Sequence, residues 1–519
     1  METARKYLFF STIFLFIYAL CSVTNGADLD LWHRMAVGQI FWQTGSVFYH
    51  DIFAYTHVKD LWVDHEWGTG VIFYALIRLF GDYGLIFLRI FLFFAVIILI
   101  FATNQLIIGQ KNNFKTGFYL VSSYAVFYGF QNYIRSQVFT YFFFTLWIYM
   151  LERVRKDEPT EQYLKYIWVF PVTMLIWANL HGGFITGLGL LLIYAAGEFL
   201  NRNKSLIYLK ILALSLPVTL INPYGIKFWE YMATAATMPR PYIIEWLPIN
   251  LTGYLYDYLG FKLLLLATIF AWSYKLSLKN KKINWTGAIL LVVTLCLTLN
   301  HQRHVVFFAI AAAIFSFQYY YEAVTDIYNK YVSKYLEFLS PKSRNLLNFG
   351  ITSALVIPII VFVIHTAAPL SIKVSDTDYP ARAVEFIRIN NLKGNLLLPF
   401  NWGSYALWKL YPQCKVSLDG RYEETYPDYV YKEVTDFVFR NKNWNNVLKK
   451  YHNDVILVPA KTDIYSELKK VKNWKLIYKD KNAALFIPIT AHSKSWKFPD
   501  KNIDYSKMKL NTVVRHFGN

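Results

Sequence analysis

The stretch Ala27-Asp28-Leu29-Asp30-Leu31-Trp32-His33 follows directly on the hydrophobic N-terminal segment, and Asp64-His65-Glu66-Trp67 closes the loop that it opens. Four carboxylates and two histidines therefore lie between apolar segments that must be buried in lipid. Ionisable groups at a membrane are energetically expensive, and they are usually retained for chemistry or transport. This loop, residues 25–67, is therefore the first candidate for a functional site.

The composition indicates a membrane protein with many spanning helices. The 519 residues are 55% hydrophobic, 19% aromatic and only 17% charged, which is too apolar for an ordinary soluble protein. Several apolar runs approach or exceed the roughly 18 residues of a spanning helix. The first run, residues 7–23, has a basic start and resembles a signal peptide. We interpret it as a retained first helix, because many spans follow it.

The net charge of +19 is also explained by a membrane location, since lysine and arginine gather in cytoplasmic loops and at the membrane rim. We therefore expect membrane lipids as partners and no nucleic acid. Cys21, Cys296 and Cys414 are scattered, and two of them lie within apolar segments. This spacing excludes a disulfide framework and a thiolate metal site.

The basic loops give the orientation of the chain in the membrane. Arg5 and Lys6 place the N-terminus in the cytoplasm, so residues 25–67 lie outside. The later basic connections can all face the cytoplasm if the chain crosses about eleven times and ends outside. After the first helix, the predicted spans are 84–108, 116–134, 137–152, 167–181, 184–200, 207–224, 261–277, 284–300, 304–323 and 348–368. The short apolar segment 68–80 carries Arg78, so we interpret it as a re-entrant or interface-lying helix.

After Pro369 the composition shifts to that of a soluble domain. Apolar runs of strand length occur at 395–400, 415–418, 454–459 and 476–487. Helix-like stretches alternate with them at 380–389, 427–439, 444–451 and 463–470. This alternation predicts a small α/β domain. The sequence thus divides into a polytopic α-helical transmembrane domain, residues 1–368, and an extracytoplasmic α/β domain, residues 370–519.

Polar motifs in the later connections fall on the same side of the membrane as the first loop. The residues concerned are Arg135, His181, Arg240, Glu245, His301, Arg303 and His304. The cytoplasmic loops contain lysine, arginine and asparagine without a comparable grouping. This one-sided clustering predicts a site at the outer face of the cytoplasmic membrane.

Three motifs resemble those of a known enzyme class. They are Asp30-Leu31-Trp32 with Gly38, His65-Glu66-Trp67, and Asp419-Gly420-Arg421. With the loop after the first helix, they resemble the GT-C superfamily of integral-membrane glycosyltransferases, of the mannosyltransferase-like and Rgt-like kind. The similarity is strongest to an uncharacterised bacterial subgroup, and it covers most of the chain in layout. The paired prolines that often follow the return carboxylate in mannosyltransferase-like families are absent here, so donor specificity does not carry over.

The resemblance implies transfer of a sugar, with inversion, from a polyprenyl-phosphate donor to a glycan, lipid or protein acceptor. Asp28 or Asp30 would act as catalytic base, and Glu66, or Asp64 beside it, would be the second acidic residue. Asp28 and Asp30 together are also candidate ligands of Mg²⁺ or Mn²⁺. The leaving phosphate needs cations or a metal. The candidate substrate-binding residues are His33, Asp64, His65, Arg135, His181, Arg240, Glu245, His301, Arg303 and His304.

Structural interpretations compete with these assignments. Asp28 or Asp30 fits the N-cap of the interfacial helix that the spacing of apolar residues predicts, with Gly45 as its stop. The acidic pair near residues 64–66 could stabilise a helix N-terminus, and Asp419-Gly420-Arg421 fits an ion pair that closes a turn. Two other functions also stay open, a transporter or flippase of lipid-linked glycans and a non-catalytic scaffold. A transporter should carry ionisable residues deep within its spans, whereas these lie at the outer ends.

Overall fold

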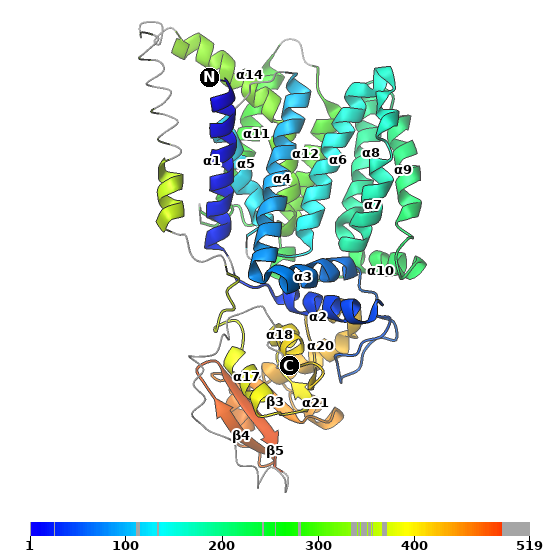
Figure 1. Cartoon of the computed structure of the whole chain (residues 1–519), viewed down its shortest axis with the longest axis vertical. Coiled ribbons are helices and arrows are strands. Elements are labelled where there is room, and N and C mark those ends of the chain that lie inside the picture. The colour runs from blue at the N-terminus through cyan, green and yellow to red at the C-terminus, as the bar shows by residue number, and fades with distance from the viewer. Residues whose placement is uncertain are drawn as a thin grey trace.

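The apolar segments form the helices of an elongated bundle, because a chain in lipid must satisfy its backbone hydrogen bonds within each helix. In the computed structural model of the chain these helices run side by side (Figure 1). They are α1 (Glu2–Val23), α4 (Asp82–Ile108), α5 (Thr116–Val126), α6 (Gln137–Asp157), α7 (Val169–Leu180), α8 (Ile185–Leu200), α9 (Leu206–Val218), α11 (Leu259–Ser277), α12 (Trp285–Asn300), α13 (Val305–Phe315) and α14 (Phe317–Ile327). The structure describes residues 2–24, 26–109, 115–131, 134–240, 243–254, 256–278, 282–333, 340, 343, 350, 354, 357–365 and 371–489.

The length and hydropathy of these helices identify an integral membrane protein. Within the described residues, four helices are long and apolar enough to cross a membrane, and the bent pair Gln302–Phe315 and Phe317–Val332 makes a fifth. Four shorter apolar helices are Trp67–Phe80, Val169–Leu180, Leu206–Leu220 and Trp285–Asn300. The number of about eleven crossings stays a prediction, and the predicted span 348–368 lies largely outside the described residues.

Three helices lie across one end of the bundle (Figure 1). They are α2 (Leu29–Thr44), α3 (Trp67–Phe80) and α10 (Ile226–Thr237). A helix is confirmed at the predicted place as α2, and it ends where expected, because Gly45 adopts the left-handed conformation (φ 69°) that closes a helix. Its place in the membrane interface stays a prediction. Segment 68–80 forms the short apolar helix α3, and whether this helix is re-entrant or lies in the interface stays a prediction.

Glycines bring α2 and α3 into backbone contact. A side-chain carbon on Gly38 would lie 2.0 Å from the carbonyl oxygen of Gly70, and one on Gly70 would lie 2.6 Å from the carbonyl oxygen of Arg34. No larger residue fits at either position without separating the helices. The contact brings the middle of α2 beside the start of α3, and so brings Arg34 close to Glu66.

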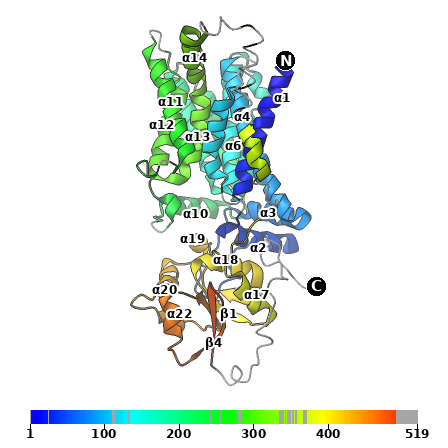
Figure 2. The same ribbon diagram turned by 90° about the vertical axis from the view of Figure 1, so that its left-hand side faces the viewer.

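The C-terminal domain is the predicted α/β unit, and it packs beyond α2 at the end of the bundle (Figure 2). Its five-stranded sheet has the order β2-β1-β3-β5-β4, with β1 parallel to β2 and β3, and β5 antiparallel to β3 and β4. The strands are β1 (Gly394–Leu397), β2 (Cys414–Val416), β3 (Val455–Pro459), β4 (Trp474–Lys479) and β5 (Ala483–Pro488). The helices are α17 (Ala381–Ile389), α18 (Phe400–Leu410), α19 (Tyr422–Thr425), α20 (Asp428–Val438), α21 (Asn446–Lys450) and α22 (Asp463–Leu468).

Helix α18 is the one long element of this domain that the sequence does not predict. Its first turns contain Asn401 and Gly403, which are weak helix formers and favour a turn. Gly403 is needed because α18 packs closely against the residues that follow β2. A side-chain carbon at this position would lie 1.9 Å from the carbonyl oxygen of Leu418.

The first loop is joined to the edge of this sheet. Val416 N–H donates to the carbonyl of Phe53 at 2.9 Å, and Tyr55 N–H donates to the carbonyl of Val416 at 3.2 Å. The hydroxyl of Thr56 donates to the carbonyl of Ser417 at 2.7 Å. The loop therefore extends the sheet beyond β2 and protects its edge, so that the N-terminal loop and the C-terminal domain form one continuous unit.

Candidate functional site

Asp28 is the N-cap of α2, which settles the competition between the two aspartates for this role. Its Oδ1 accepts the backbone N–H of Asp30 at 2.9 Å. Its Oδ2 accepts Arg135 Nε–H at 2.7 Å. Both oxygens of Asp28 are therefore engaged, one in capping the helix and the other in an ion pair with the start of α6.

Asp30 lies in the first turn of α2 and has a different environment. Among the described residues, its carboxylate takes part in no hydrogen bond or ion pair. Burial and the neighbouring charge of Asp28 raise the pKa of Asp30 to about 7, against the lowering influence of Arg135 and Arg34. A carboxylate with this pKa is suited to accept a proton near neutral pH.

Glu245 joins two of the predicted phosphate-binding arginines. Its Oε2 accepts Arg135 Nη1–H at 2.6 Å, and its Oε1 lies 3.9 Å from Arg303 Nη1. The adjacent Trp246 contacts the guanidinium groups of Arg240 and Arg303, each 4.4 Å from the centre of its ring. The short 3-10 turn Ile244–Trp246 is thus held against three arginines, close to the start of α2.

The two histidines of the same region make local contacts with backbone carbonyls. His301 Nδ1 lies 2.6 Å from the carbonyl oxygen of Trp246, and His304 Nδ1 lies 3.3 Å from that of Leu297. A ring nitrogen facing a carbonyl must carry a proton. The predicted phosphate contact of these histidines can then come only through Nε2, and only in the protonated ring.

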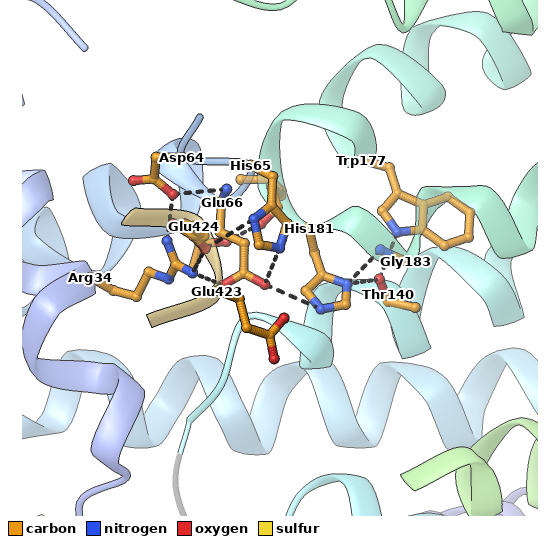
Figure 3. A network of polar contacts seen from close by, with 12 residues as sticks. Arg34, Asp64, His65, Glu66, Thr140, Trp177, His181, Gly183, Glu423 and Glu424 are labelled. Atoms are coloured by element: carbon orange, nitrogen blue, oxygen red, sulfur yellow. Dashed lines mark hydrogen bonds and ion pairs between the residues drawn. The ribbon is translucent and has the colours of Figure 1, made fainter. Parts of the chain in front are cut away.

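Arg34 is the centre of a second, buried group of charges (Figure 3). Its guanidinium pairs with Asp64, lies 2.8 Å from Glu66 Oε2, and lies 3.0 Å from Glu424 Oε1. The side chains of all four residues are less than 10% exposed. One arginine therefore joins the first loop, the start of α3 and α19 of the C-terminal domain. With His65, these residues form what we call the Arg34 network.

His65 is the second cation of the Arg34 network. Its Nδ1 lies 3.0 Å from Glu424 Oε1, and its Nε2 lies 3.4 Å from Glu66 Oε1. Burial alone would lower the pKa of His65, but these two carboxylates raise it to about 10. Two cations thus face three carboxylates, and burial raises the pKa of the third carboxylate, Asp64, to about 6.

His181 is oriented by a chain of hydrogen bonds (Figure 3). Trp177 Nε1–H donates to Thr140 Oγ1 at 2.8 Å, and Thr140 Oγ1 lies 2.7 Å from His181 Nδ1. The N–H of Gly183 also donates to Nδ1, at 2.9 Å. Because Nδ1 accepts, the proton of a neutral ring is on Nε2, which lies 3.3 Å from Glu66 Oε1. The structure therefore joins predicted residues His181 and Glu66.

The remaining predicted residues lie at the junction with the C-terminal domain. Arg240 makes a bidentate ion pair with Glu423 of α19, with both contacts 2.6 Å long. His33 is buried, and its Nδ1 lies 3.2 Å from Ser404 Oγ of α18. Neither side chain is open to solvent as a free binding group in this arrangement.

Asp419-Gly420-Arg421 contains the ion pair that the structural interpretation predicts. Arg421 Nη2 lies 2.6 Å from Asp419 Oδ2, which also accepts the hydroxyl of Tyr426 at 2.7 Å. Arg421 additionally pairs with Asp51 of the first loop. Asp51 in turn accepts the N–H groups of Phe53 and Ala54 at 3.0 and 2.7 Å. The motif therefore fastens the first loop to the domain.

The aspartate pair does not fit a metal site in this arrangement. A metal ion at Asp28 would have to compete with Asp30 N–H, which its Oδ1 accepts, and with Arg135, which pairs with its Oδ2. Within the part of the chain that the structure describes, no three His, Cys, Asp or Glu side chains are placed to hold a metal ion. Asp30 alone has a carboxylate that could become a ligand, and Mg²⁺ or Mn²⁺ stays a prediction.

The site also contains residues that the sequence does not single out. Three such residues complete its ion pairs. Arg34 is the cation between the first-loop carboxylates and Glu424, and Glu423 is the carboxylate that pairs with Arg240. The available signal for Arg34 is its position four residues after Asp30, on the same face of α2. The signal for the two glutamates is their position just after Asp419-Gly420-Arg421.

The fold has relatives among solved structures, whereas no protein-family model and no curated protein matches the sequence. The archaeal oligosaccharyltransferase AglB from Archaeoglobus fulgidus, in complex with an inhibitory peptide and a dolichol-phosphate, has a TM-score of 0.59 and 10% identity. The match covers 93% of this chain and 74% of the AglB chain. ArnT from Cupriavidus metallidurans in the apo state has a TM-score of 0.53 and 11% identity, and the match covers 93% of this chain and 98% of the ArnT chain.

A third relative is the arabinofuranosyltransferase AftD from Mycobacteria, with a TM-score of 0.50 and 11% identity over 93% of this chain and 40% of its own. All three are GT-C glycosyltransferases, so the chain has a GT-C-like fold. At these identities the likeness concerns the fold alone. The chemistry must therefore be argued from the residues of the site.

Proposed function

We propose that the protein is a membrane glycosyltransferase that moves a sugar from a polyprenyl-phosphate donor to an acceptor, with Asp30 as the base. The observation that carries the proposal is the Asp30 carboxylate, which has no bonded partner among the described residues and a pKa of about 7. A carboxylate in an ion pair would be a poor base, whereas this one is free to accept a proton. The dolichol-phosphate bound to AglB supports a lipid-phosphate donor.

In the proposed step, an acceptor hydroxyl attacks the anomeric carbon of the donor sugar. The new glycosidic bond forms as the bond from the anomeric carbon to the phosphate oxygen breaks, and the configuration inverts. Asp30 takes the hydroxyl proton, and polyprenyl phosphate leaves with the electron pair of the broken bond. General-base catalysis of this kind contributes about 10²- to 10⁴-fold.

The departing phosphate gains negative charge and needs cations. Arg135 and Arg303 are two of the predicted cations, and both face the carboxylate of Glu245. We propose that the donor phosphate replaces Glu245 on these two arginines. Glu66, which His181, His65 and Arg34 hold, stays a candidate for orienting the acceptor.

Replacing Glu245 with glutamine tests this exchange. The amide keeps the shape of the side chain but removes the charge that competes with the phosphate, so the KM for the donor should fall about 3- to 10-fold, which corresponds to about 1 kcal/mol for a partly exposed pair. Glu230→Gln, on the exposed side of α10, is the matched control. A higher KM in Glu245→Gln would mean instead that Glu245 binds the sugar.

We propose that the site faces the outside of the cytoplasmic membrane. Three basic residues of the predicted cytoplasmic connections lie at helix ends. Arg155 and Lys275 are in the last turns of α6 and α11, and Arg202 follows α8. These helix ends lie opposite the C-terminal domain (Figure 1). The positive-inside rule assigns such an end to the cytoplasm. The first loop and the C-terminal domain would then be extracytoplasmic, and about eleven crossings would satisfy this arrangement.

Chelation tests the predicted divalent cation. If Mg²⁺ or Mn²⁺ takes part, EDTA should abolish sugar transfer, and either ion should restore it, because a metal would neutralise the leaving phosphate. The measurement is transfer by the full-length protein in liposomes. Activity that persists after complete chelation would remove the metal from the proposal.

The overall proposal is tested by mass spectrometry of surface glycans and lipid-linked sugars in cells with and without the protein. A transferase predicts loss of one sugar from a glycan and accumulation of its polyprenyl-phosphate donor. If the protein is a flippase, its loss should instead leave the donor on the cytoplasmic side of the membrane. If it is a scaffold, its loss should change neither the donor nor the linkage. The Asp30 variant separates these alternatives, because neither rival needs a base.

A further inference from the structure

The Asp419-Gly420-Arg421 turn of the C-terminal domain lies directly against the first turns of α2. A side-chain carbon on Gly420 would lie 3.1 Å from Asp30 Oδ1, 3.2 Å from His33 Nδ1, and 2.9 Å from Ser404 Oγ. Gly420 does not adopt a positive φ, so its backbone is open to any residue. The requirement for glycine therefore comes from the space that Asp30 and its neighbours occupy.

The turn is held in place by ion pairs and by close packing against α18. Arg421 is fully buried, and it pairs with Asp419 and with Asp51 of the first loop. Gly403 allows α18 to contact the carbonyl of Leu418. Because these contacts fix the turn against α2, the backbone of Gly420 limits the positions that the Asp30 carboxylate can occupy.

Ser404 connects the turn to α2. Its Oγ accepts the N–H of Gly420 at 2.9 Å and lies 3.2 Å from His33 Nδ1. Burial and the charge of Arg34 lower the pKa of His33 to about 3, so the ring is neutral. Which of Ser404 Oγ and His33 Nδ1 donates to the other depends on the tautomer of this neutral ring, whose second nitrogen is Nε2. That nitrogen is buried and has no hydrogen-bond partner within the described residues.

We infer that Gly420 and Ser404 of the C-terminal domain are positioning residues for Asp30, so that this domain forms one wall of the reaction site. Asp30 has no bonded partner among the described residues, so its carboxylate must be positioned by what it packs against. The inference rests on the proposed function, since it assumes that Asp30 is the base. It assigns to the domain a part in catalysis besides fastening the first loop.

Gly420→Ala tests the inference. The added methyl group should displace the Asp30 carboxylate by a few tenths of an ångström, and kcat should fall about 10- to 100-fold, because a small misplacement of a catalytic group is costly. The KM for the donor should stay within about twofold. The assay uses the full-length protein in liposomes with undecaprenyl phosphate-linked hexoses and pentoses. Gly189→Ala, where a side-chain carbon meets open space, is the matched control.

The pH profile separates positioning from a merely structural role. The charged groups around Asp30 are Asp28 and Arg34, Arg135 before α6, and Glu66 at the start of α3. None of them changes in Gly420→Ala. The methyl group excludes water from the carboxylate, so the acidic limb of kcat/KM should move to higher pH. A lower kcat with an unmoved limb would overturn the inference, as would an unchanged kcat.

Ser404→Ala decides the question if Gly420→Ala does not fold, because it only removes an oxygen atom. It should lower kcat about tenfold, while Ser466→Ala, at an exposed position of the same domain, should not. Unchanged kcat in Ser404→Ala would overturn the inference. The proposed function fails separately, if Asp30→Asn keeps its activity. Inactive Asp30→Asn together with fully active Gly420→Ala rejects the positioning role alone.

Discussion

Asp30→Asn should lower kcat by about 10³-fold while leaving the KM for the donor nearly unchanged. Asparagine has the shape of aspartate but cannot accept the proton of the acceptor hydroxyl, and the loss of a general base is worth about 10²- to 10⁴-fold. The measurement is release of undecaprenyl phosphate from its sugar conjugates by the full-length protein in liposomes. Asp60→Asn, at an exposed position of the same loop, should keep full activity.

The pH dependence of the wild-type protein follows from the same assignment. Burial and Asp28 raise the pKa of Asp30 to about 7, so the base is protonated and inactive below this pH. The value of kcat/KM should therefore rise between about pH 6 and 8. An acidic limb near pH 4 would show that the base is an ordinary solvated carboxylate, and residual activity of Asp30→Asn close to wild type would exclude Asp30 as the base.

Arg34→Met should destabilise the protein by about 3–5 kcal/mol, because it leaves the buried carboxylates of Asp64, Glu66 and Glu424 without their shared cation. Methionine keeps much of the apolar volume, so the loss reflects charge and not a cavity. The measurement is the unfolding temperature of the purified protein in detergent. Arg78→Met, at an exposed position of α3, should leave that temperature nearly unchanged.

A second substitution identifies the cause of the loss. Glu424→Gln removes one of the three carboxylates, so the double variant with Arg34→Met should recover part of the lost stability. Non-additivity of this kind is expected for residues in direct contact. Equal unfolding temperatures of Arg34→Met and the wild type would contradict the central place of Arg34 in its network.

The helices follow from local patterns, which explains why the sequence predicts them well. The apolar spacing in residues 29–44 and the position of Gly45 predict α2 and its end. The prediction cannot separate Asp28 from Asp30 as the N-cap, because both precede the helix with suitable side chains. That choice depends on Arg135, which holds Asp28 from another part of the chain.

The charge pairs of the site depend on tertiary contacts and are far harder to predict. Arg34 and Glu424 are 390 residues apart in the chain, and no local pattern joins them. The sequence correctly brings Glu66 and His181 to one end of the protein, but it gives no sign that they contact each other. Likewise, the closeness of Gly420 to Asp30 requires both the first loop and the C-terminal domain in place.

The central claim is that Asp30 acts as the base for sugar transfer from a polyprenyl-phosphate donor. The decisive measurement supplies wild type and Asp30→Asn, in liposomes, with undecaprenyl phosphate-linked hexoses and pentoses and a glycan fraction from the native envelope. Mass spectrometry should find that only the wild type consumes a donor, releasing one undecaprenyl phosphate for each glycosidic bond formed. Equal consumption by both proteins, or none by the wild type, would contradict the account.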